Sequence, residues 1–411
     1  MRQVAITGMG IISPLGNDIP SFWAALCAGE CGIGPITRFD TEKFKVKLAA
    51  EVKYFDPLQY MEKADLIHRD LYTQYALAAA AQAMEDSGIL GKVAPERLAV
   101  YFSSGVGGMG TFQTEVGKLL EKGPKRVSPY FVPMMIANMA AAEIAIQYQA
   151  RGACIPVVTA CATGSNSIGE ALRAIRHGYA DAVICGGAEA PIMEISVAGF
   201  ANMMALSQSE DPNAASLPFD ARRGGFVMGE GAGCLVLEEL EGAKARGAHI
   251  YGILAGYGSS CDAHHITAPQ PEAEGAIRAI RQAIGEAGGC EGKQIYINAH
   301  GTGTPLNDAA ETRAIKGALG RAVEHCLLSS SKSMTGHMLG AAGAAEAIVT
   351  ALALERGIIP PTINLEQPDP ECDLDYTPLH SRAAKPGLGL SLSLGFGGHN
   401  ACLAILKAGE K

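Results

Sequence analysis

The feature that most constrains the fold is an internal repeat, because four segments of the first part of the chain return in the same order later. The paired segments are 4–10 with 251–258, 99–105 with 295–301, the segment around Cys161 with Cys326–Ala347, and 233–238 with 401–406. Any α/β protein shows some echoes of strand and helix, but a shared order favours duplication. We therefore expect two similar halves, residues 1–250 and 251–411.

Within each half, short β-rich runs alternate with Ala-rich runs of helical length. The expected strands are Val4–Thr7, Leu98–Phe102, residues 155–160, Val183–Cys185 and Cys234–Glu238, and the expected helices are Thr73–Asp86, Ala137–Tyr148 and Ser165–Gly178. Hydrophobic residues make up 48% of the 411-residue chain and charged residues 18%, which is enough apolar material for a large core. The alternation predicts an α/β fold whose strands are covered by helices.

The charge and the cysteine pattern disfavour several functional classes. A net charge of −9 makes non-specific binding to nucleic acid an unfavourable role. The 11 cysteines form no CxxC pair, which favours buried thiols in a reducing compartment. The N-terminus lacks the layout of a signal peptide, and no apolar run of about 20 residues predicts a membrane helix. We expect a cytoplasmic protein that binds neither nucleic acid nor membrane.

Cys161 lies between the expected strand at 155–160 and an expected helix. A thiol at a helix N-terminus is expected to have a lowered pKa, and backbone N–H groups there can hold an oxyanion. The small neighbours Ala160, Ala162 and Gly164 let a substrate approach. The arrangement is that of a nucleophile elbow with Cys in place of Ser. A packed core thiol is the alternative, and this segment alone does not decide between them.

Two histidines lie in polar, glycine-rich surroundings further along the chain. His300 follows the apolar run 295–297 and precedes Gly301, and a loop at the end of a strand is a common place for a site. We expect His337 to open an Ala/Gly-rich helix, and the neutral imidazole is favoured at a helix N-terminus. The alternatives are a loop histidine bonded to backbone for His300 and a solvated helix start for His337.

Lys332 and Glu346 flank His337 among many small residues. Burial of an unpaired Lys or Glu is costly, so a buried location favours an ion pair between them. We expect Lys332 and Glu346 to form a network around His337.

Other kinds of site fit less well. The scattered histidines lack the spacing of a zinc motif, so we expect no metal ligands of that kind. The glycine strings near 105–110 and 395–398 lack the strand and helix context of a dinucleotide fingerprint.

Together these contexts resemble the β-ketoacyl-[acyl-carrier-protein] synthases, condensing enzymes of the thiolase fold, and most closely the type II synthase of bacterial fatty acid synthesis. The resemblance covers nearly the whole chain. The shared motifs are Thr-Ala-Cys-Ala-Thr-Gly at 159–164, Gly-Gly-Ala-Glu at 186–189, Pro-Phe-Asp at 218–220, Gly-Phe-Val-Met-Gly-Glu-Gly-Ala-Gly at 225–233, Asn-Ala-His-Gly-Thr at 298–302, Lys-Ser-Met-Thr-Gly-His at 332–337, Pro-Pro-Thr-Ile-Asn-Leu at 360–365 and Gly-Phe-Gly-Gly-His-Asn at 395–400. The resemblance implies a five-layered αβαβα thiolase-like fold made of two duplicated halves. The first half carries the nucleophilic cysteine and the second carries both histidines.

The resemblance also implies an acyltransferase, a 3-oxoacyl-[acyl-carrier-protein] synthase that elongates an acyl chain by two carbons. Cys161 would hold the acyl group as a thioester, and the N–H groups of Cys161 and Phe396 would form the oxyanion hole. His300 and His337 would polarise the malonyl thioester and stabilise the enolate left by loss of CO2. Lys332 and Glu346 would hold the two histidines in their working state. No cofactor is implied beyond the phosphopantetheine that the acyl carrier protein brings.

Further positions match residues of the family that bind substrates and partners. Thr302 and Thr304 match residues that hydrogen-bond the pantetheine arm, Phe396 matches a gating phenylalanine, and Val106 matches a residue that lines the acyl tunnel across the interface of a homodimer. The residues that match or neighbour the basic patch for the acidic carrier protein are Lys63, Arg69, Lys125 and Arg126.

The chain departs from the sequence pattern of the family at four other positions. Leu392 replaces an asparagine, which removes an expected ligand of a monovalent-cation site that some members have. Leu394 replaces a phenylalanine, which changes the wall beside Cys161 and bears on gating and chain selectivity. Ile67 and Met204 stand where arginines are expected, so steered docking of an acidic carrier protein should be slower.

Three other functions are alternatives to fatty acid synthesis. The thinned basic patch and Leu394 favour a ketosynthase of a specialised type II polyketide pathway. A thiolase would need a second catalytic cysteine near 395–400, where the chain has none. A silent chain-length partner would lack the nucleophile, whereas Cys161 is present.

Overall fold

The computed structural model describes residues 1–409. The strands are β1 (Val4–Ile12), β2 (Gly34–Pro35), β3 (Leu48–Ala49), β4 (Leu98–Ser103), β5 (Ala182–Glu189), β6 (Gly231–Glu239), β7 (Gly252–Cys261), β8 (Ile295–Asn298), β9 (Cys326–Ser329), β10 (Ile358–Ile359), β11 (Arg382–Ala383), β12 (Leu388–Gly395) and β13 (His399–Lys407). The α-helices are α1 (Ile19–Ala28), α2 (Lys63–Leu66), α3 (Leu71–Ser87), α4 (Met109–Lys122), α5 (Phe131–Met135), α6 (Met139–Tyr148), α7 (Thr163–Arg176), α8 (Glu194–Asn202), α9 (Leu240–Ala245), α10 (Glu274–Glu286), α11 (Pro305–Leu319), α12 (Lys332–Thr335) and α13 (Ala342–Arg356). The helices expected at Thr73–Asp86, Ala137–Tyr148 and Ser165–Gly178 are confirmed as α3, α6 and α7 within a few residues at each end.

Nine of the strands form one sheet in the order β4-β5-β6-β1-β7-β13-β12-β8-β9. The order confirms the internal repeat, because β4, β5, β6 and β1 correspond to β8, β12, β13 and β7 with the same parallel and antiparallel neighbours. A bridge between Val100 and Cys154 beyond β4 takes the place that β9 has beside β8. The halves meet at β1 and β7, which share two residue pairs. The domain boundary near residue 250 stays a prediction.

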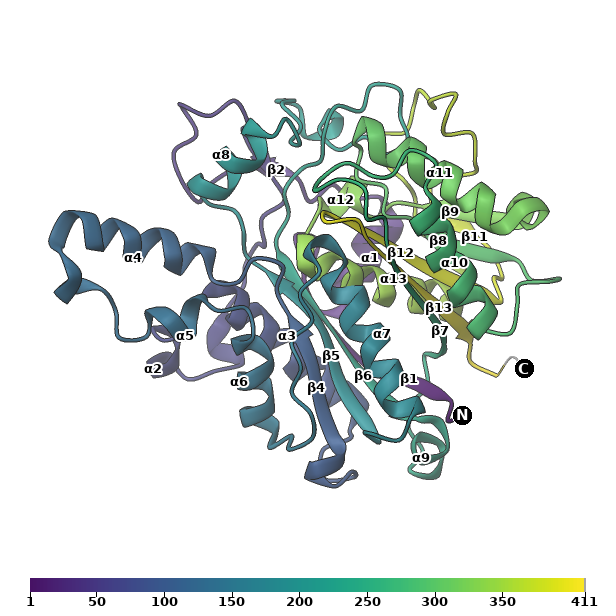
Figure 1. The fold of residues 1–411 in the computed structure, drawn as a ribbon, viewed down its shortest axis with the longest axis horizontal. Coiled ribbons are helices and arrows are strands. Elements are labelled where there is room, and N and C mark those ends of the chain that lie inside the picture. The colour runs from purple at the N-terminus through teal and green to yellow at the C-terminus, as the bar shows by residue number, and fades with distance from the viewer. Residues whose placement is uncertain (410–411) are drawn as a thin grey trace.

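Helices divide the molecule into five layers (Figure 1). Helices α3 and α6 cover the outer face of the first half of the sheet, and α10 and α11 cover the outer face of the second. Helices α7 and α13 lie between the halves and pack on both. The expected αβαβα arrangement is therefore confirmed.

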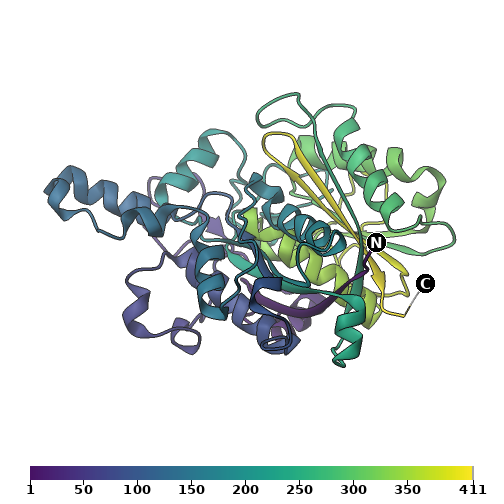
Figure 2. The ribbon, with the colours of Figure 1, turned by 60° about the horizontal axis from the view of Figure 1, so that its bottom comes forward.

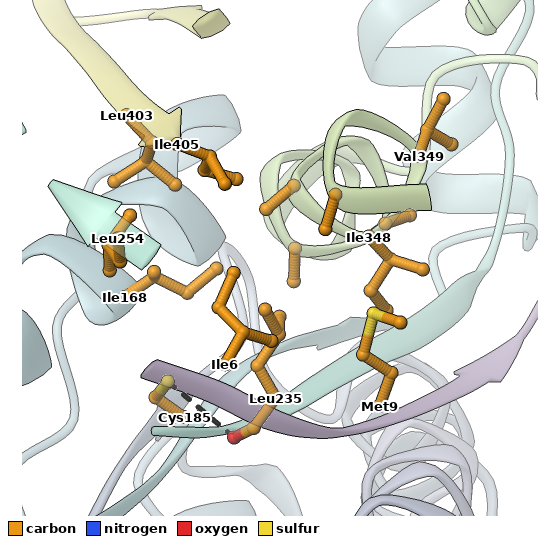
Figure 3. Close-up of a cluster of buried hydrophobic side chains, with 14 of the residues drawn as sticks. Ile6, Met9, Ile168, Cys185, Leu235, Leu254, Ile348, Val349, Leu403 and Ile405 are labelled. Atoms are coloured by element: carbon orange, nitrogen blue, oxygen red, sulfur yellow. Dashed lines mark hydrogen bonds between the residues drawn. The ribbon is translucent and has the colours of Figure 1, made fainter. Parts of the chain in front are cut away.

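The central layer is built from small and apolar side chains. Every residue of α13 from Ala342 to Leu354 is buried, and all of them are small or apolar except Glu346 and Thr350, which have polar partners. Figure 3 shows the core around this layer, where Ile168 and Ile348 face strand residues such as Ile6 and Leu403. Gly343 lets α13 approach α7, because a Cβ at this position would lie 2.7 Å from the backbone nitrogen of Ser165.

The strand expected at 155–160 is not formed as a buried strand. Cys154 makes a single bridge to Val100, and Ile155 and Val158 are 44% and 52% exposed. The segment lies at the outer edge of the sheet, and no strand of the described residues covers its other side. The apolar run therefore indicates an edge rather than a core strand.

One arm projects from the layered body. Helix α4 extends away from the sheet in both orientations, and α5 leads the chain back to it (Figures 1 and 2). The arm exposes large apolar side chains, among them Leu120 and Val132. No helix within residues 1–409 is both long and apolar enough to span a membrane.

Candidate active site

Cys161 sits in a tight turn that leads directly into α7. The turn spans Ala160–Ala162, and Ala160 has a left-handed φ of 50°. Such a conformation costs a non-glycine residue about 1–3 kcal/mol, and strain of this kind gathers at functional sites. The thiol is buried in an apolar cluster that includes Phe226 and Leu339. The geometry therefore agrees with the expected nucleophile elbow.

The electrostatic setting of Cys161 differs from the sequence expectation. Burial raises the pKa of the Cys161 thiol to about 11, while the charge of Lys332 and the N–H groups of Phe396 and Cys161 act to lower it. The prediction of a lowered pKa is wrong, because the free-energy cost of removing a thiolate from water exceeds the stabilisation that these groups give it. The same two N–H groups predicted to form the oxyanion hole thus lie within hydrogen-bonding reach of the sulfur.

His300 follows β8 and is held by a carboxylate that sequence reasoning missed. Its backbone N–H donates to Oε1 of Glu311 over 2.6 Å, and the N–H of Gly301 donates to Oε2 over 2.8 Å. Burial raises the pKa of Glu311 to about 7. No local motif around Glu311 indicates this role, because its partners come from the loop that precedes α11.

His337 lies before the central helix rather than at its first turn. The turn after α12 carries it, its N–H donates to the carbonyl of Val227 over 2.7 Å, and α13 begins only at Ala342. The prediction that His337 opens the helix is therefore wrong, since Gly336 and a short turn at Leu339–Ala341 intervene.

The two imidazoles form a close, nearly perpendicular pair. Their ring centroids are 5.3 Å apart with an interplanar angle of 88°. Burial, followed by the charge of Lys332, holds the pKa of His300 and His337 well below the usual histidine range. Both rings are therefore neutral near pH 7 and able to donate a hydrogen bond without carrying charge.

Lys332 and Glu346 form a buried ion pair, as the sequence indicated. Lys332 lies in α12 and Glu346 in α13, and both side chains are almost fully enclosed. Burial raises the pKa of Glu346 to about 7, against the opposing effect of Lys332. The charge of Lys332 acts on Cys161 and on both histidines, so this one cation influences all three groups.

A cavity of about 400 Å³ brings the expected residues together. The predicted site residues that line it are Cys161, His300, His337, Thr302, Thr304 and Phe396. The hydroxyls of Thr302 and Thr304 lie 3.0 Å apart on the loop that precedes α11. The mouth is bordered by the largely exposed side chains of Met204 and Leu306. A thioester arm that entered here would meet polar groups on one wall before it reached the thiol.

The remaining predicted residues lie outside this cavity. Val106 is partly exposed on the loop after β4 and does not line the cavity of the single chain. Lys63, Lys125 and Arg126 are exposed, whereas Arg69 is bound to Asp65 and Glu143. Ion pairing makes Arg69 the weakest of the four as a docking cation.

The residues that depart from the family pattern take up separate positions. Leu394 lines the cavity and a small adjoining space beside Ala276 and Ala279. Ile67 and Met204 are 72% and 82% exposed, so two large apolar side chains stand at the surface where cations were expected.

A group of buried polar side chains faces the central layer without hydrogen-bond partners among the described residues. The group consists of Asn298, Ser391 and Oε2 of Glu346, and Asn298 and Ser391 are neighbours across β8 and β12. Such oxygens suit ordered water or a hard cation. Leu392 points to the opposite face, into the cluster under α10 and α11. A side chain at position 392 therefore does not reach this group, and the leucine there removes no ligand from it.

Comparisons with known proteins agree with this geometry. The family model of the β-ketoacyl synthase N-terminal domain matches residues 1–243, and that of the C-terminal domain matches residues 251–366. A protein of Synechocystis sp. named 3-oxoacyl-[acyl-carrier-protein] synthase 2 is 50% identical over 408 residues, 99% of this chain and 98% of that protein. A protein of the same name from Staphylococcus aureus is 48% identical over the same shares of both chains.

Solved structures give the same result. The ishigamide ketosynthase/chain length factor superposes with a TM-score of 0.93 at 39% identity, over 99% of this chain and 100% of that one. A β-ketoacyl synthase from Burkholderia phymatum superposes with a TM-score of 0.92 at 34% identity and the same coverage. A type II polyketide ketosynthase in complex with its acyl-carrier protein superposes with a TM-score of 0.92 at 32% identity, over 99% of this chain and 100% of that one. The chain belongs to the β-ketoacyl synthase family.

Proposed function

We propose that the protein is a β-ketoacyl-[acyl-carrier-protein] synthase that condenses malonyl-carrier protein with an acyl group held on Cys161. The observation that carries the proposal is the convergence of Cys161, His300 and His337 on one cavity, with Lys332 acting on all three. A nucleophile and two neutral hydrogen-bond donors are the groups that acyl transfer followed by decarboxylation requires.

The first half-reaction moves the acyl group from the carrier to the enzyme. The sulfur of Cys161 attacks the thioester carbonyl, and the N–H groups of Cys161 and Phe396 stabilise the tetrahedral oxyanion. The carbon–sulfur bond to the carrier breaks, and the proton released by the Cys161 thiol leaves with the carrier thiol. Because the pKa of Cys161 is about 11, the thiol loses its proton during attack rather than beforehand.

The second half-reaction forms the new carbon–carbon bond. Neutral His300 and His337 donate hydrogen bonds to the carbonyl oxygen of the malonyl thioester. The bond to the carboxylate breaks, CO2 leaves, and its electron pair forms the enolate that the two histidines stabilise. The α-carbon then attacks the acyl-Cys161 thioester and releases the thiolate. The product is a 3-oxoacyl chain on the carrier, and no cofactor of the enzyme takes part.

An acyl carrier protein is the partner that delivers both substrates. The exposed cations Lys63, Lys125 and Arg126 offer positive charge to an acidic carrier, and Thr302 and Thr304 offer hydroxyls to its pantetheine arm. All 11 cysteines are free thiols, which supports the expected cytoplasmic setting.

We also infer a homodimer. Ile155 and Val158 line an open sheet edge, and an exposed apolar edge of this kind is a template for pairing with a second chain. Val106 follows β4, the strand next to this edge, so a partner copy seated there would bring Val106 toward a shared acyl tunnel.

Fatty acid elongation is favoured over a polyketide role. Relatives named 3-oxoacyl-[acyl-carrier-protein] synthase 2 share about half of their residues with this chain, whereas the type II polyketide ketosynthase is 32% identical. Leu394 and the exposed Met204 are the features that still favour the polyketide alternative.

The proposal is tested with purified protein, a saturated acyl-carrier protein and malonyl-carrier protein. The expected products are CO2 and a 3-oxoacyl-carrier protein two carbons longer, measured by mass spectrometry of the carrier. Substitution His300→Ala should leave self-acylation of Cys161 intact and abolish decarboxylation. Loss of self-acylation with retained decarboxylation would reverse the assigned roles.

A further inference from the structure

A third buried carboxylate, beside those of Glu311 and Glu346, takes no part in the reaction described above. Glu189 ends β5, its side chain is fully enclosed, and it is not among the residues that line the active-site cavity. A buried carboxylate is costly unless donors surround it, so its partners show what it holds in place.

The carboxylate of Glu189 joins two loops that are far apart in the sequence. On one side it accepts hydrogen bonds from the Ser104 hydroxyl and from the N–H groups of Gly105 (2.8 Å) and Val106 (3.3 Å). On the other side it accepts the N–H of Gly340 over 2.9 Å. Every hydrogen-bond partner is a donor, which is the arrangement that an ionised carboxylate needs. Burial raises the pKa of Glu189 to about 7, so the carboxylate is ionised at the alkaline pH at which the Cys161 thiol titrates.

These two loops pack against the turn that contains Cys161. A Cβ on Gly105 would lie 2.8 Å from Oε2 of Glu189 and 3.3 Å from the carbonyl of Ala160, the residue before the nucleophile. A Cβ on Gly340, three residues after His337, would lie 2.7 Å from Oε2 of Glu189. The carboxylate therefore contacts the segments on either side of the reacting groups.

Resting on the proposed function, we propose that Glu189 is a positioning residue for Cys161: its carboxylate ties the loop after β4 to the turn before α13 and places a negative charge beside the thiol. The charge of Glu189 raises the pKa of Cys161 and that of Tyr72, so these are the titratable groups that face it. Lys332 is the opposing charge on Cys161, and the neutral His300 and His337 line the same cavity.

Two variants separate the positional effect from the charge effect. Glu189→Gln keeps the size of the side chain but removes the charge and turns an amide NH2 toward N–H donors. Glu189→Asp keeps the charge but is one methylene too short to reach both loops. Glu238→Gln is the matched control, because Glu238 is also buried but lies at the opposite end of the β5–β6 pair.

The charge is tested by the pH profile of Cys161 alkylation with iodoacetamide, followed by peptide mass spectrometry, since the chain has 11 cysteines. In Glu189→Gln the midpoint should fall by about one pH unit, because a like charge near the thiolate is gone. In Glu189→Asp and Glu238→Gln it should stay at the wild-type value. Exposure of the buried thiol by a disturbed fold would also lower this midpoint. An equal fall in Glu189→Asp, or an unchanged or raised midpoint in Glu189→Gln, therefore overturns the proposal.

The position is tested by the rate of self-acylation from acyl-carrier protein. The rate of self-acylation should fall about 10²-fold in both Glu189 variants, as expected when a reacting group is displaced by about 1 Å. It should fall in Glu189→Gln even though the thiol of that variant ionises more readily, and wild-type rates in both variants overturn the proposal. The alkylation arm uses no carrier protein, so a wild-type protein that fails to self-acylate contradicts the proposed function while the midpoint shift still decides the role of Glu189.

Discussion

Lys332 and Glu346 form an ion pair that is closed off from solvent behind the two histidines of the cavity. The pair places one positive charge where it disfavours the imidazolium form of His300 and His337 and favours the thiolate of Cys161. A single buried cation thus favours the working protonation states of all three reacting groups, while Glu346 keeps that cation in place.

Substitution Lys332→Met should raise the pKa of both histidines, because the cation that disfavours their protonation is removed. The acid limb of malonyl decarboxylation should then move to higher pH, measured from the pH–rate profile. Stability should fall by about 3–5 kcal/mol, since Glu346 loses its buried partner. Glu346→Gln retains the Lys332 charge and serves as the control. An acid limb that does not move in Lys332→Met contradicts this account.

Glu311 should make the protein less stable as pH rises. Its folded pKa, about 7, lies above the ordinary 4.5, so the folded state binds the proton more tightly. The stabilising contribution is complete below pH 4.5 and is lost as pH rises through about 7, a change of about 3 kcal/mol. Urea unfolding at several pH values should show a shallower slope in Glu311→Gln than in wild type, because burial raises the pKa of Glu189 and Glu346 to about 7 as well and these two groups still contribute. An equal slope in both proteins would mean that Glu311 does not contribute to the pH dependence of stability. Substitution Glu121→Gln at the surface provides the control.

The close approach of α7 and α13 should make Gly343→Ala destabilising. The added methyl would lie within 3 Å of Ser165 backbone, and overpacking of this kind costs about 1–3 kcal/mol. Gly199→Ala in α8 is the matched control, because nothing lies within 4 Å of its Cβ position and alanine favours a helix. Thermal unfolding should show a lower Tm for Gly343→Ala only. Equal Tm values for the two variants would mean that the layers are not in contact as described.

Substitution Ile155→Asp should convert a dimer into monomers, because it places a charge on the open apolar edge of the sheet. Light scattering with size-exclusion chromatography measures the mass of each variant. Ile266→Asp, on the exposed loop near the cavity mouth, should leave the mass unchanged. A dimer that survives Ile155→Asp places the interface elsewhere.

Local patterns in the sequence predicted much of the fold and the members of the site. The repeated order of segments predicted the two halves, and the motifs around Cys161, His300 and His337 predicted residues that the fold brings to one cavity. The apolar run at 155–160 predicted a buried strand wrongly, since nothing local tells an edge from a core.

Features that depend on tertiary contacts were missed or misjudged. The pKa of Cys161 is set by how completely the turn is buried, which the helix N-terminus alone does not reveal. Glu189 and Glu311 act through loops that only the fold brings to them. The motif that contains Glu189 was recognisable, but its partners at Gly105 and Gly340 were not.

The most direct test of the central claim is the intact mass of Cys161→Ala and of wild type after incubation with acyl-carrier protein. The wild-type protein should gain one acyl group on Cys161 and form the 3-oxoacyl product once malonyl-carrier protein is added. The variant should gain none and form no product, while it still releases CO2 from malonyl-carrier protein through His300 and His337. Condensation by Cys161→Ala, or an acyl group of the wild-type protein on any other residue, would contradict the account.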